Sequence, residues 1–214
     1  ATYQKQFAYS QEELESILHV LAENGQEATG SMGDDTPFAV LSQRPRLIYD
    51  YFRQKFAQVT NPPIDPLREA HVMSLATCIG REMNVFCEAE GQAHRLSFKS
   101  PILLYSDFQQ LINQESLYYQ AIHLDITYQP TGSNLETALH QLCVKAQQEV
   151  RNGAVLLILS DRNITKERLP IPAPMAVGAV QKALVDNNLR CDANIIVETA
   201  SARDPHHFAV LLGF

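Results

Sequence analysis

The chain has 214 residues, of which 45% are hydrophobic and 19% are charged, and its formal net charge at pH 7 is −7. This composition is typical of a globular protein with one large domain or two small ones. The negative charge argues against a nucleic-acid partner. No apolar run approaches the roughly 18 residues that a membrane helix needs, so we expect no membrane partner either.

The two ends of the chain bear on its location and completeness. The first ten residues, ATYQKQFAYS, lack the apolar core of a secretion signal, so we expect a cytoplasmic protein. The chain starts without methionine and stops inside the apolar run LLGF. This leads us to expect a piece of a longer protein.

The four cysteines give no sign of a metal site. Cys78, Cys87, Cys143 and Cys191 include no pair at the close spacing of metal ligands. We therefore interpret them as buried or free thiols in a reducing compartment, and we predict no metal site in this chain.

The first helix is predicted to begin after Ser10. The sequence Ser10-Gln11-Glu12-Glu13 is a capping box, in which the Glu13 side chain can reach back to the N–H of the cap. Leucine and isoleucine then recur at helical spacing. Gly25 is placed to end the helix in a left-handed conformation.

The glycine-containing loop Gly30–Pro37 lacks the residues of a phosphate or metal site. It contains no lysine, and Asp34 and Asp35 would repel a phosphate. A metal site at the two aspartates lacks a third oxygen ligand at loop spacing. We predict a tight turn followed by a short strand over residues 38–41.

Two helices are predicted on either side of a proline-rich crossing. The first covers residues 45–58 and carries an aromatic-rich stripe that is typical of a core-facing side. The second covers residues 66–77, with Asp65 as its cap and Pro66 at its first position. Alternation of polar and apolar residues over 94–99 then predicts a half-exposed strand.

The crossing between these helices is a stiff segment. The adjacent prolines Pro62 and Pro63 fix two φ angles, remove two N–H donors and push the preceding residues to an extended backbone. Thr60 and Asn61 are thereby predicted to be held in fixed directions. Such stiffness is useful where another group packs or passes.

From residue 100 onwards the pattern changes to repeated strand–helix units. Apolar runs predict four strands, over residues 102–105, 122–128, 154–159 and 194–197. Helices are predicted after these strands, over residues 108–112, 134–150, 175–187 and 205–212. Ser133–Glu136 forms a second capping box at the start of the longest of these helices.

These elements predict an α/β fold of mostly parallel βα units that resembles an incomplete (β/α) barrel, with an N-terminal helical portion. Residues 1–99 form the helical and loop portion, and residues 100–214 form the repeated βα units. Four units cannot close a barrel of eight strands. We therefore expect sheet edges that need a neighbour.

Candidate chemistry in such a fold lies at the carboxyl ends of the strands. The most polar of these ends is Asp161-Arg162-Asn163, which either binds a ligand or caps the next segment, with Asp161 and Arg162 paired. His206 and His207 are adjacent, and adjacent residues on a helix point about 100° apart, so they do not form a chelating pair.

The sequence contains no nucleophile elbow, phosphate loop, dinucleotide fingerprint or zinc-protease motif. We therefore predict no catalytic, cofactor-binding or metal-binding residue in this chain. The alternative function that remains open is a self-standing α/β module that binds a small ligand at the strand end described above.

Several long stretches of the sequence resemble one family. They are GSMGDDTPFAVLS, RLIYDYFRQKFAQVTNPPIDPLREAHVMSL, LSDRNI, PAPMAVGAV and CDANIIVETASARDPHHFAVLLGF. Together they resemble the central region of bacterial glutamate synthase, more narrowly of the large (alpha) chain of the NADPH-dependent enzyme. The resemblance covers essentially the whole chain.

The resemblance implies a parent enzyme that forms L-glutamate from L-glutamine and 2-oxoglutarate. In that family a glutaminase domain releases ammonia, a central α/β domain follows, and an FMN-binding (β/α)₈ synthase domain carries an iron–sulfur cluster. FAD and NADPH enter through a small (beta) subunit. The resemblance implies that this chain is the central domain, with no catalytic cysteine and no cofactor of its own.

The family also carries ammonia through an internal tunnel between its two active sites, and the central domain contributes to the tunnel wall. This gives the stiff crossing a candidate purpose. We predict that Ser31, Met32, Thr60 and Asn61 border a narrow ammonia path.

Overall fold

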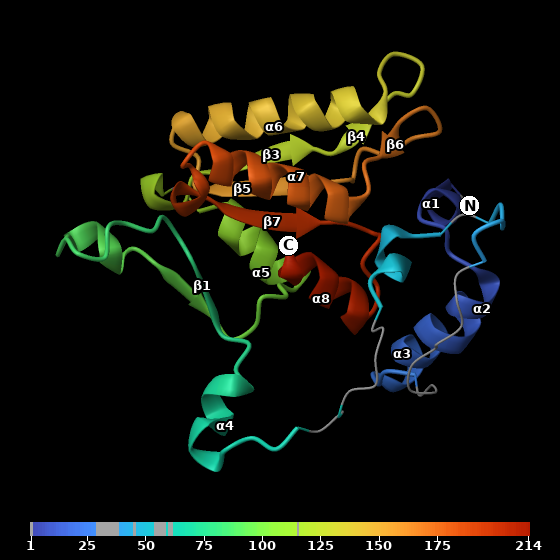
Figure 1. Ribbon diagram of the computed structural model, residues 1–214, viewed down its shortest axis with the longest axis horizontal. Helices are drawn as coiled ribbons and strands as arrows, with labels where there is room; N and C mark the ends of the chain where they lie inside the picture. Colours follow the sequence, from blue (N-terminus) through green and yellow to red (C-terminus); the bar gives the residue numbers. More distant parts are fainter. Residues whose placement is uncertain (1, 29–38, 45, 54–58, 60–61, 115) are drawn as a thin grey trace.

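The computed structural model describes residues 2–28, 39–44, 46–53, 59, 62–114 and 116–214. A parallel sheet lies at its centre, with the strand order β3-β5-β7 (Figure 1). The three strands are β3 (Ala121–Asp125), β5 (Leu156–Ser160) and β7 (Asn194–Glu198). In the register of the sheet, Leu159 of β5 lies between Leu124 and Val197.

Two layers cover the sheet because its central strand is apolar on both faces. Leu157 and Leu159 belong to the larger core cluster, with residues of α6 (Leu135–Arg151) and α7 (Ala173–Asp186). Leu156 belongs to a second cluster, with Leu111 of α5 and the partly buried side chains of a hairpin. Helix α5 covers Tyr105–Ile112, and the hairpin pairs β1 (Thr77–Ile79) with β2 (Leu96–Phe98) in antiparallel fashion.

The remaining elements lie around these layers (Figure 1). A short antiparallel pair, β4 (Thr127–Tyr128) and β6 (Leu169–Pro170), extends one end of the sheet. Helix α8 (Pro205–Gly213) follows β7 and contacts α7. The other helical segments are α1 (Thr2–Gln6), α2 (Gln11–Glu13), η1 (Leu14–Leu18), α3 (His19–Asn24), η2 (Ile48–Tyr51), α4 (Pro66–Val72), η3 (Glu90–Ala93), η4 (Leu117–Tyr119) and η5 (Arg190–Asp192).

The predicted α/β class is confirmed, with three of the four expected parallel strands. The strand expected over residues 102–105 is wrong, because residues 102–104 form no strand and α5 begins at Tyr105. Ile102 and Leu104 are exposed, and the side chain of Leu103 packs on the second core cluster. The apolar run therefore packs against a face of the sheet and does not join it.

The helix expected over residues 45–58 is also wrong within the described residues. Only one 3₁₀ turn forms, and the backbone is already extended at Phe52. Tertiary contacts explain the difference. Tyr49 is buried, and the rings of Phe52 and Phe214 pack edge to face with their centroids 5.6 Å apart. Such contacts override a local helical preference.

Helix α4 and the segment after it confirm the prediction in part. Asp65 caps α4 as predicted, accepting the N–H of Leu67 at 2.9 Å. The helix ends at Val72 and does not reach residue 77 as predicted. Residues 77–79 form strand β1, which is too short to show an alternation of polar and apolar residues in the sequence. Leu67 is 94% exposed, so this helix buries little apolar surface against the described residues.

The cap of α6 differs by one residue from the expected capping box. Asn134, and not Ser133, is the cap, and its side-chain oxygen accepts the N–H of Thr137 at 2.7 Å. We expect Asn134→Ala to lower the free energy of unfolding by about 1 kcal/mol, the usual cost of a lost cap. Ser133→Ala is the matched control, and urea unfolding of both variants makes the comparison. An equal or larger loss for Ser133→Ala would contradict this assignment.

Within the described residues, no helix combines the length and the apolar character required to cross a bilayer.

Candidate functional site

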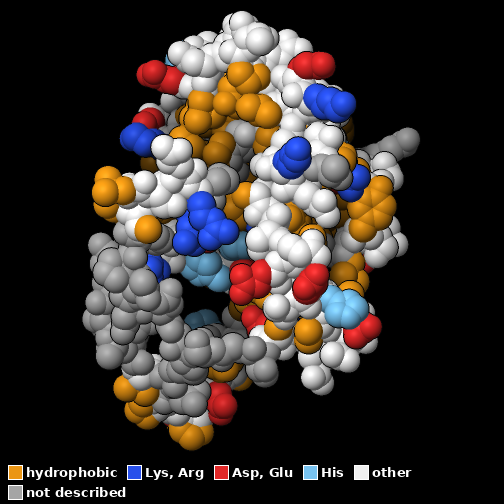
Figure 2. Space-filling view, turned by 90° about the vertical axis from the view of Figure 1, so that its right-hand side faces the viewer, with side chains coloured by type: hydrophobic (Ala, Val, Ile, Leu, Met, Phe, Trp, Pro, Cys, Tyr) orange, Lys and Arg blue, Asp and Glu red, His pale blue; other side chains and the backbone are white. Residues whose placement is uncertain are grey.

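The carboxyl ends of the three parallel strands meet at one edge of the sheet, beside the N-terminal helices (Figure 1). Figure 2 looks onto this side of the molecule, where acidic, basic and histidine side chains are interspersed across the middle of the face. The polar residues that the sequence singled out after β5, together with those after β3 and β7, lie at this edge. We call it the carboxyl edge.

Asp161, at the end of β5, is buried with 4% exposure. Its carboxylate accepts the hydroxyl of Thr199 and the N–H of Ala200, both from the segment after β7. Burial raises the pKa of the Asp161 carboxyl, while these two hydrogen bonds act in the opposite direction. Asp161 therefore ties the end of β5 to the end of β7.

Arg162 points to a different partner than the sequence suggested. It forms an ion pair with Glu198, the last residue of β7, and does not pair with Asp161. Glu198 also accepts the hydroxyl of Ser160 at 2.6 Å. The guanidinium of Arg162 lies 5.3 Å from the ring centroid of Tyr105, within the range of a cation–π contact.

A second ion pair holds the end of β3. Arg168 binds the Asp125 carboxylate at 2.9 Å and donates to the Thr127 hydroxyl at 3.0 Å. Asn163 donates to the same carboxylate at 3.2 Å. Asp161, Arg162 and Asn163 thus all have protein partners, which favours a structural role for this strand end over the ligand-binding alternative.

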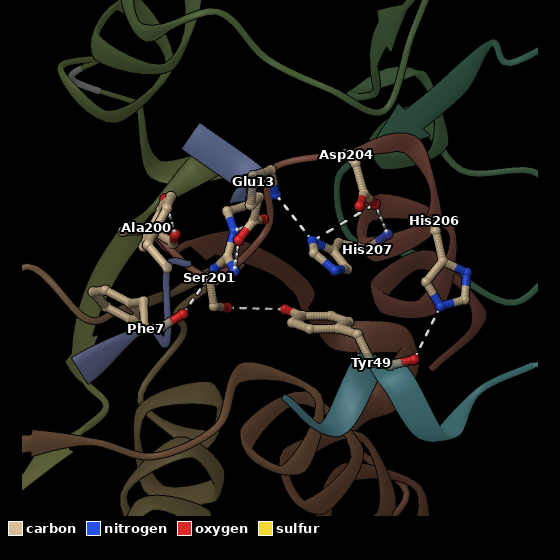
Figure 3. A network of polar contacts seen from close by, with 10 residues as sticks. Phe7, Glu13, Tyr49, Ala200, Ser201, Asp204, His206 and His207 are labelled. Atoms are coloured by element: carbon tan, nitrogen blue, oxygen red, sulfur yellow. Dashed lines mark hydrogen bonds and ion pairs between the residues drawn. The ribbon is translucent and has the colours of Figure 1, made fainter. Parts of the chain in front are cut away.

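Arg203 attaches the N-terminal helices to the carboxyl edge, and its partners Glu13 and Phe7 are labelled in Figure 3. Its guanidinium forms a two-point ion pair with Glu13 and donates to the carbonyl of Phe7 at 2.9 Å. It also lies 3.9 Å from the ring centroid of Tyr9. The Arg203 side chain is only 6% exposed. We call these four residues the Arg203 anchor.

The anchor also corrects the expected capping box at the first helix. Ser10 does cap the helix, because its hydroxyl accepts the N–H of Glu13 at 3.0 Å. The Glu13 carboxylate binds Arg203 and does not serve the cap N–H. Gly25 ends this helical stretch with φ of 62°, as predicted.

A chain of hydroxyl groups connects a further N-terminal residue to Asp161, and Figure 3 shows its first link, between Tyr49 and Ser201. The phenol of Tyr49 lies 3.0 Å from the hydroxyl of Ser201, which lies 2.8 Å from that of Thr199. Thr199 in turn donates to Asp161. Tyr49 is almost fully buried, and burial raises the pKa of its phenol. The segment around Tyr49 is therefore fixed to the same edge as Glu13.

The two adjacent histidines serve separate partners. His206 contacts the carbonyl of Tyr49 at 2.9 Å, while His207 accepts the N–H of Arg203. Burial lowers the pKa of His207, which favours the neutral form of its ring. Asp204 caps α8, accepting the N–H of His207 at 2.8 Å.

The predicted tunnel residues Ser31, Met32, Thr60 and Asn61 lie outside the described residues. Their place in the sequence still relates to the fold. The first two lie between the anchored residues Glu13 and Tyr49, and the other two lie between Tyr49 and strand β1.

The cysteines do not fit a metal cluster within the described residues. Cys78, Cys87 and Cys191 are exposed and Cys143 is half-buried, and all four are free thiols. Burial raises the pKa of the Cys143 thiol, which disfavours the thiolate that binds metals. No group of three or more ligating side chains gathers in this part of the chain. We assign no step of cofactor chemistry to it.

The pKa of Asp161 gives a testable pH dependence. Burial in the folded chain raises this pKa above its ordinary value, so the contribution of Asp161 to stability is fully present only below the pKa of the unfolded chain. This contribution is lost as the pH rises through the folded pKa. We expect Asp161→Asn, which stays neutral, to gain stability relative to the unmodified chain as the pH rises.

The measurement is urea unfolding of both proteins at several pH values from 4 to about 7.5. Asp186→Asn, at the exposed end of α7, controls for the general loss of a carboxylate. A stability difference between Asp161→Asn and the unmodified chain that does not change with pH would contradict the assignment.

The sequence of the chain is similar to known proteins of one family. Residues 2–214 match the model of the glutamate synthase central domain. The chloroplastic ferredoxin-dependent glutamate synthase of Oryza sativa subsp. japonica is 42% identical over 99% of this chain and 13% of its own length. The NADH glutamate synthase of Schizosaccharomyces pombe is 42% identical over 97% of this chain and 10% of its own length.

A bacterial relative gives the same result. The large chain of the NADPH glutamate synthase of Azospirillum brasilense is 42% identical over 98% of this chain, which covers 14% of that relative. The chain thus spans between 10% and 14% of the length of these three relatives. The resemblance found in the sequence is confirmed, and the chain belongs to the glutamate synthase central domain family.

Proposed function

We propose that this chain is the connecting domain of a glutamate synthase large chain, which forms L-glutamate from L-glutamine and 2-oxoglutarate. The observation that carries the proposal is the family match over residues 2–214, together with three relatives that are all named glutamate synthase. In this proposal the glutaminase site and the FMN synthase site lie in other parts of the parent chain.

The structure supports a connecting role through its carboxyl edge. The polar side chains there bind each other, and the Arg203 anchor and Tyr49 fix two N-terminal segments to the same edge. Such an arrangement provides a firm spacer. The iron–sulfur cluster of the parent enzyme would be held outside this chain, because the described cysteines do not fit one.

The electron donor is assigned to a partner of this domain. The three relatives are named for ferredoxin, NADH and NADPH, yet each is 42% identical to this chain. In the NADPH-dependent form that we propose here, FAD and NADPH act through a small (beta) subunit in the cytoplasm.

The proposal includes a part in the ammonia tunnel, bordered by Ser31, Met32, Thr60 and Asn61. Two features support this assignment. One is the stiff proline crossing, and the other is that Glu13 and Tyr49, on either side of the glycine-containing loop in the sequence, are fixed to the carboxyl edge. A narrow path with small and hydroxylated side chains would be blocked by a bulky substitution.

We expect Thr60→Phe in the full-length enzyme to reduce glutamine-driven glutamate formation while ammonia-driven formation stays unchanged. Both rates are measured on the same preparation with 2-oxoglutarate in excess. Thr131→Phe, in an exposed turn before α6, is the matched control and should change neither rate. Equal rates for Thr60→Phe and the control under both nitrogen sources would reject the tunnel assignment.

A further inference from the structure

A cavity of about 480 Å³ lies between helix α6 and the β4–β6 pair, beside the end of strand β3. Figure 1 shows α6 running along β3 and beginning near β4. Cavities of this volume take small molecules. Asp161, Arg162 and Asn163, which the sequence singled out after β5, do not line it. The cavity is therefore distinct from that strand end.

The inner side of the cavity is apolar. It is formed by four buried residues of the larger core cluster, Leu124, Ala138, Leu142 and Ile171. They come from β3, α6 and the segment after β6, and core packing holds these elements in place. A ligand with a short carbon chain can pack that chain against this side of the cavity.

The outer side of the cavity carries polar side chains that bind no other protein group. The amine of Lys145 and the side-chain amides of Gln129 and Gln141 line it and are exposed. None of the three has a hydrogen-bond or ion-pair partner within the part of the chain that the structure describes. This differs from Asp161 and Arg162, whose charged groups are bound by protein partners. Donors that converge on one cavity without partners are typical of a ligand site.

Arg168 adds a second cation to the cavity. Its Nε donates to the Thr127 hydroxyl at 3.0 Å and its Nη2 binds Asp125 at 2.9 Å, whereas Nη1 has no partner among the described residues. The Asp125 carboxylate also lines the cavity, but it is bound by Arg168 and by Asn163. The charge left over is positive, in a chain whose formal net charge is −7. The cavity therefore favours an anion.

We propose that this cavity binds a small dicarboxylate, with one carboxylate at Lys145 and the other at Nη1 of Arg168. Ammonium and guanidinium groups form charge-assisted hydrogen bonds with carboxylates, and the Gln141 amide adds a further donor. The carbon chain between the two carboxylates packs on Leu142 and Ile171. Inorganic phosphate matches the charge but has no carbon chain to cover the apolar side, so a dicarboxylate fits the cavity better.

The choice of probe rests on the proposed function, in which the parent enzyme consumes the dicarboxylate 2-oxoglutarate. That compound would bind here a second time, outside both reaction centres. The rate at which an acetylating reagent modifies Lys145 in the full-length enzyme, followed by peptide mass spectrometry, reports on this site. Because only the free site reacts, 2-oxoglutarate at about ten times its Kd is expected to slow acetylation of Lys145 about tenfold. Lys182, an exposed lysine of α7 that pairs with Asp186, is the internal control and keeps its rate.

Lys145→Glu gives a second measurement, with Lys182→Glu as the matched control. Equilibrium dialysis with labelled 2-oxoglutarate should show one bound molecule fewer per chain for Lys145→Glu than for the unmodified enzyme and the control. Acetylation of Lys145 that 2-oxoglutarate does not slow, or that inorganic phosphate slows equally, would overturn the proposal, as would equal binding by all three proteins. Glutamate formation by the unmodified enzyme reports separately on the proposed function, because neither the acetylation nor the dialysis result depends on it.

Discussion

Replacing Arg203 with methionine is expected to lower the free energy of unfolding of this chain by about 3–5 kcal/mol. The substitution leaves the Glu13 carboxylate and the Phe7 carbonyl without their donor, in a part of the molecule that water reaches poorly. It also removes the cation above the Tyr9 ring. Methionine keeps a similar length, so the loss reports on charge and hydrogen bonding.

Arg162→Met is the matched control for this prediction. Arg162 also pairs with a glutamate, but its side chain is 61% exposed, and an exposed pair contributes about 1 kcal/mol or less. Urea unfolding of both variants measures the difference. If Arg203→Met cost no more than Arg162→Met, the N-terminal helices would not depend on the Arg203 anchor.

Leu157→Ala is expected to have an effect of similar size at the centre of the sheet. Leu157 has 0% exposure and packs among the side chains of α6 and α7, so truncation leaves a cavity between rigid neighbours. Such substitutions cost about 2–5 kcal/mol.

The control for this substitution is Leu117→Ala, because Leu117 is almost fully exposed. We expect that change to alter the free energy of unfolding by less than about 0.5 kcal/mol. The midpoint and slope of urea unfolding give both values. A cost below about 1 kcal/mol for Leu157→Ala would contradict the assignment of β5 as the centre of the core.

The sequence predicted the second half of the fold better than the first. From residue 116 onwards, the elements are long enough for their apolar pattern to be recognised in the sequence, as in β5 and α7. Before residue 100 the elements are short, and contacts with distant residues decide them. Tyr49 illustrates this, because the helix predicted around it forms only one 3₁₀ turn. The centroid of its ring lies 4.4 Å from that of His207.

The candidate site was predictable only in its location. The rule that strand ends collect polar groups placed Asp161 at the carboxyl edge correctly. The partners could not be read from the sequence, because Glu13 and Arg203 are 190 residues apart and no local pattern links them. The sequence pattern marked neither Arg203 nor Tyr49 as a residue of the site.

We propose that this domain holds the segments between two reaction centres that lie outside it. The most direct test of this proposal is the amount of free ammonia released per glutamine hydrolysed by the full-length enzyme carrying Arg203→Met, with Arg162→Met as control. We predict that Arg203→Met releases more free ammonia, while ammonia-driven glutamate formation is unchanged and the control behaves as the unmodified enzyme. Ammonia release that stays at the unmodified level in a folded Arg203→Met enzyme would contradict the claim.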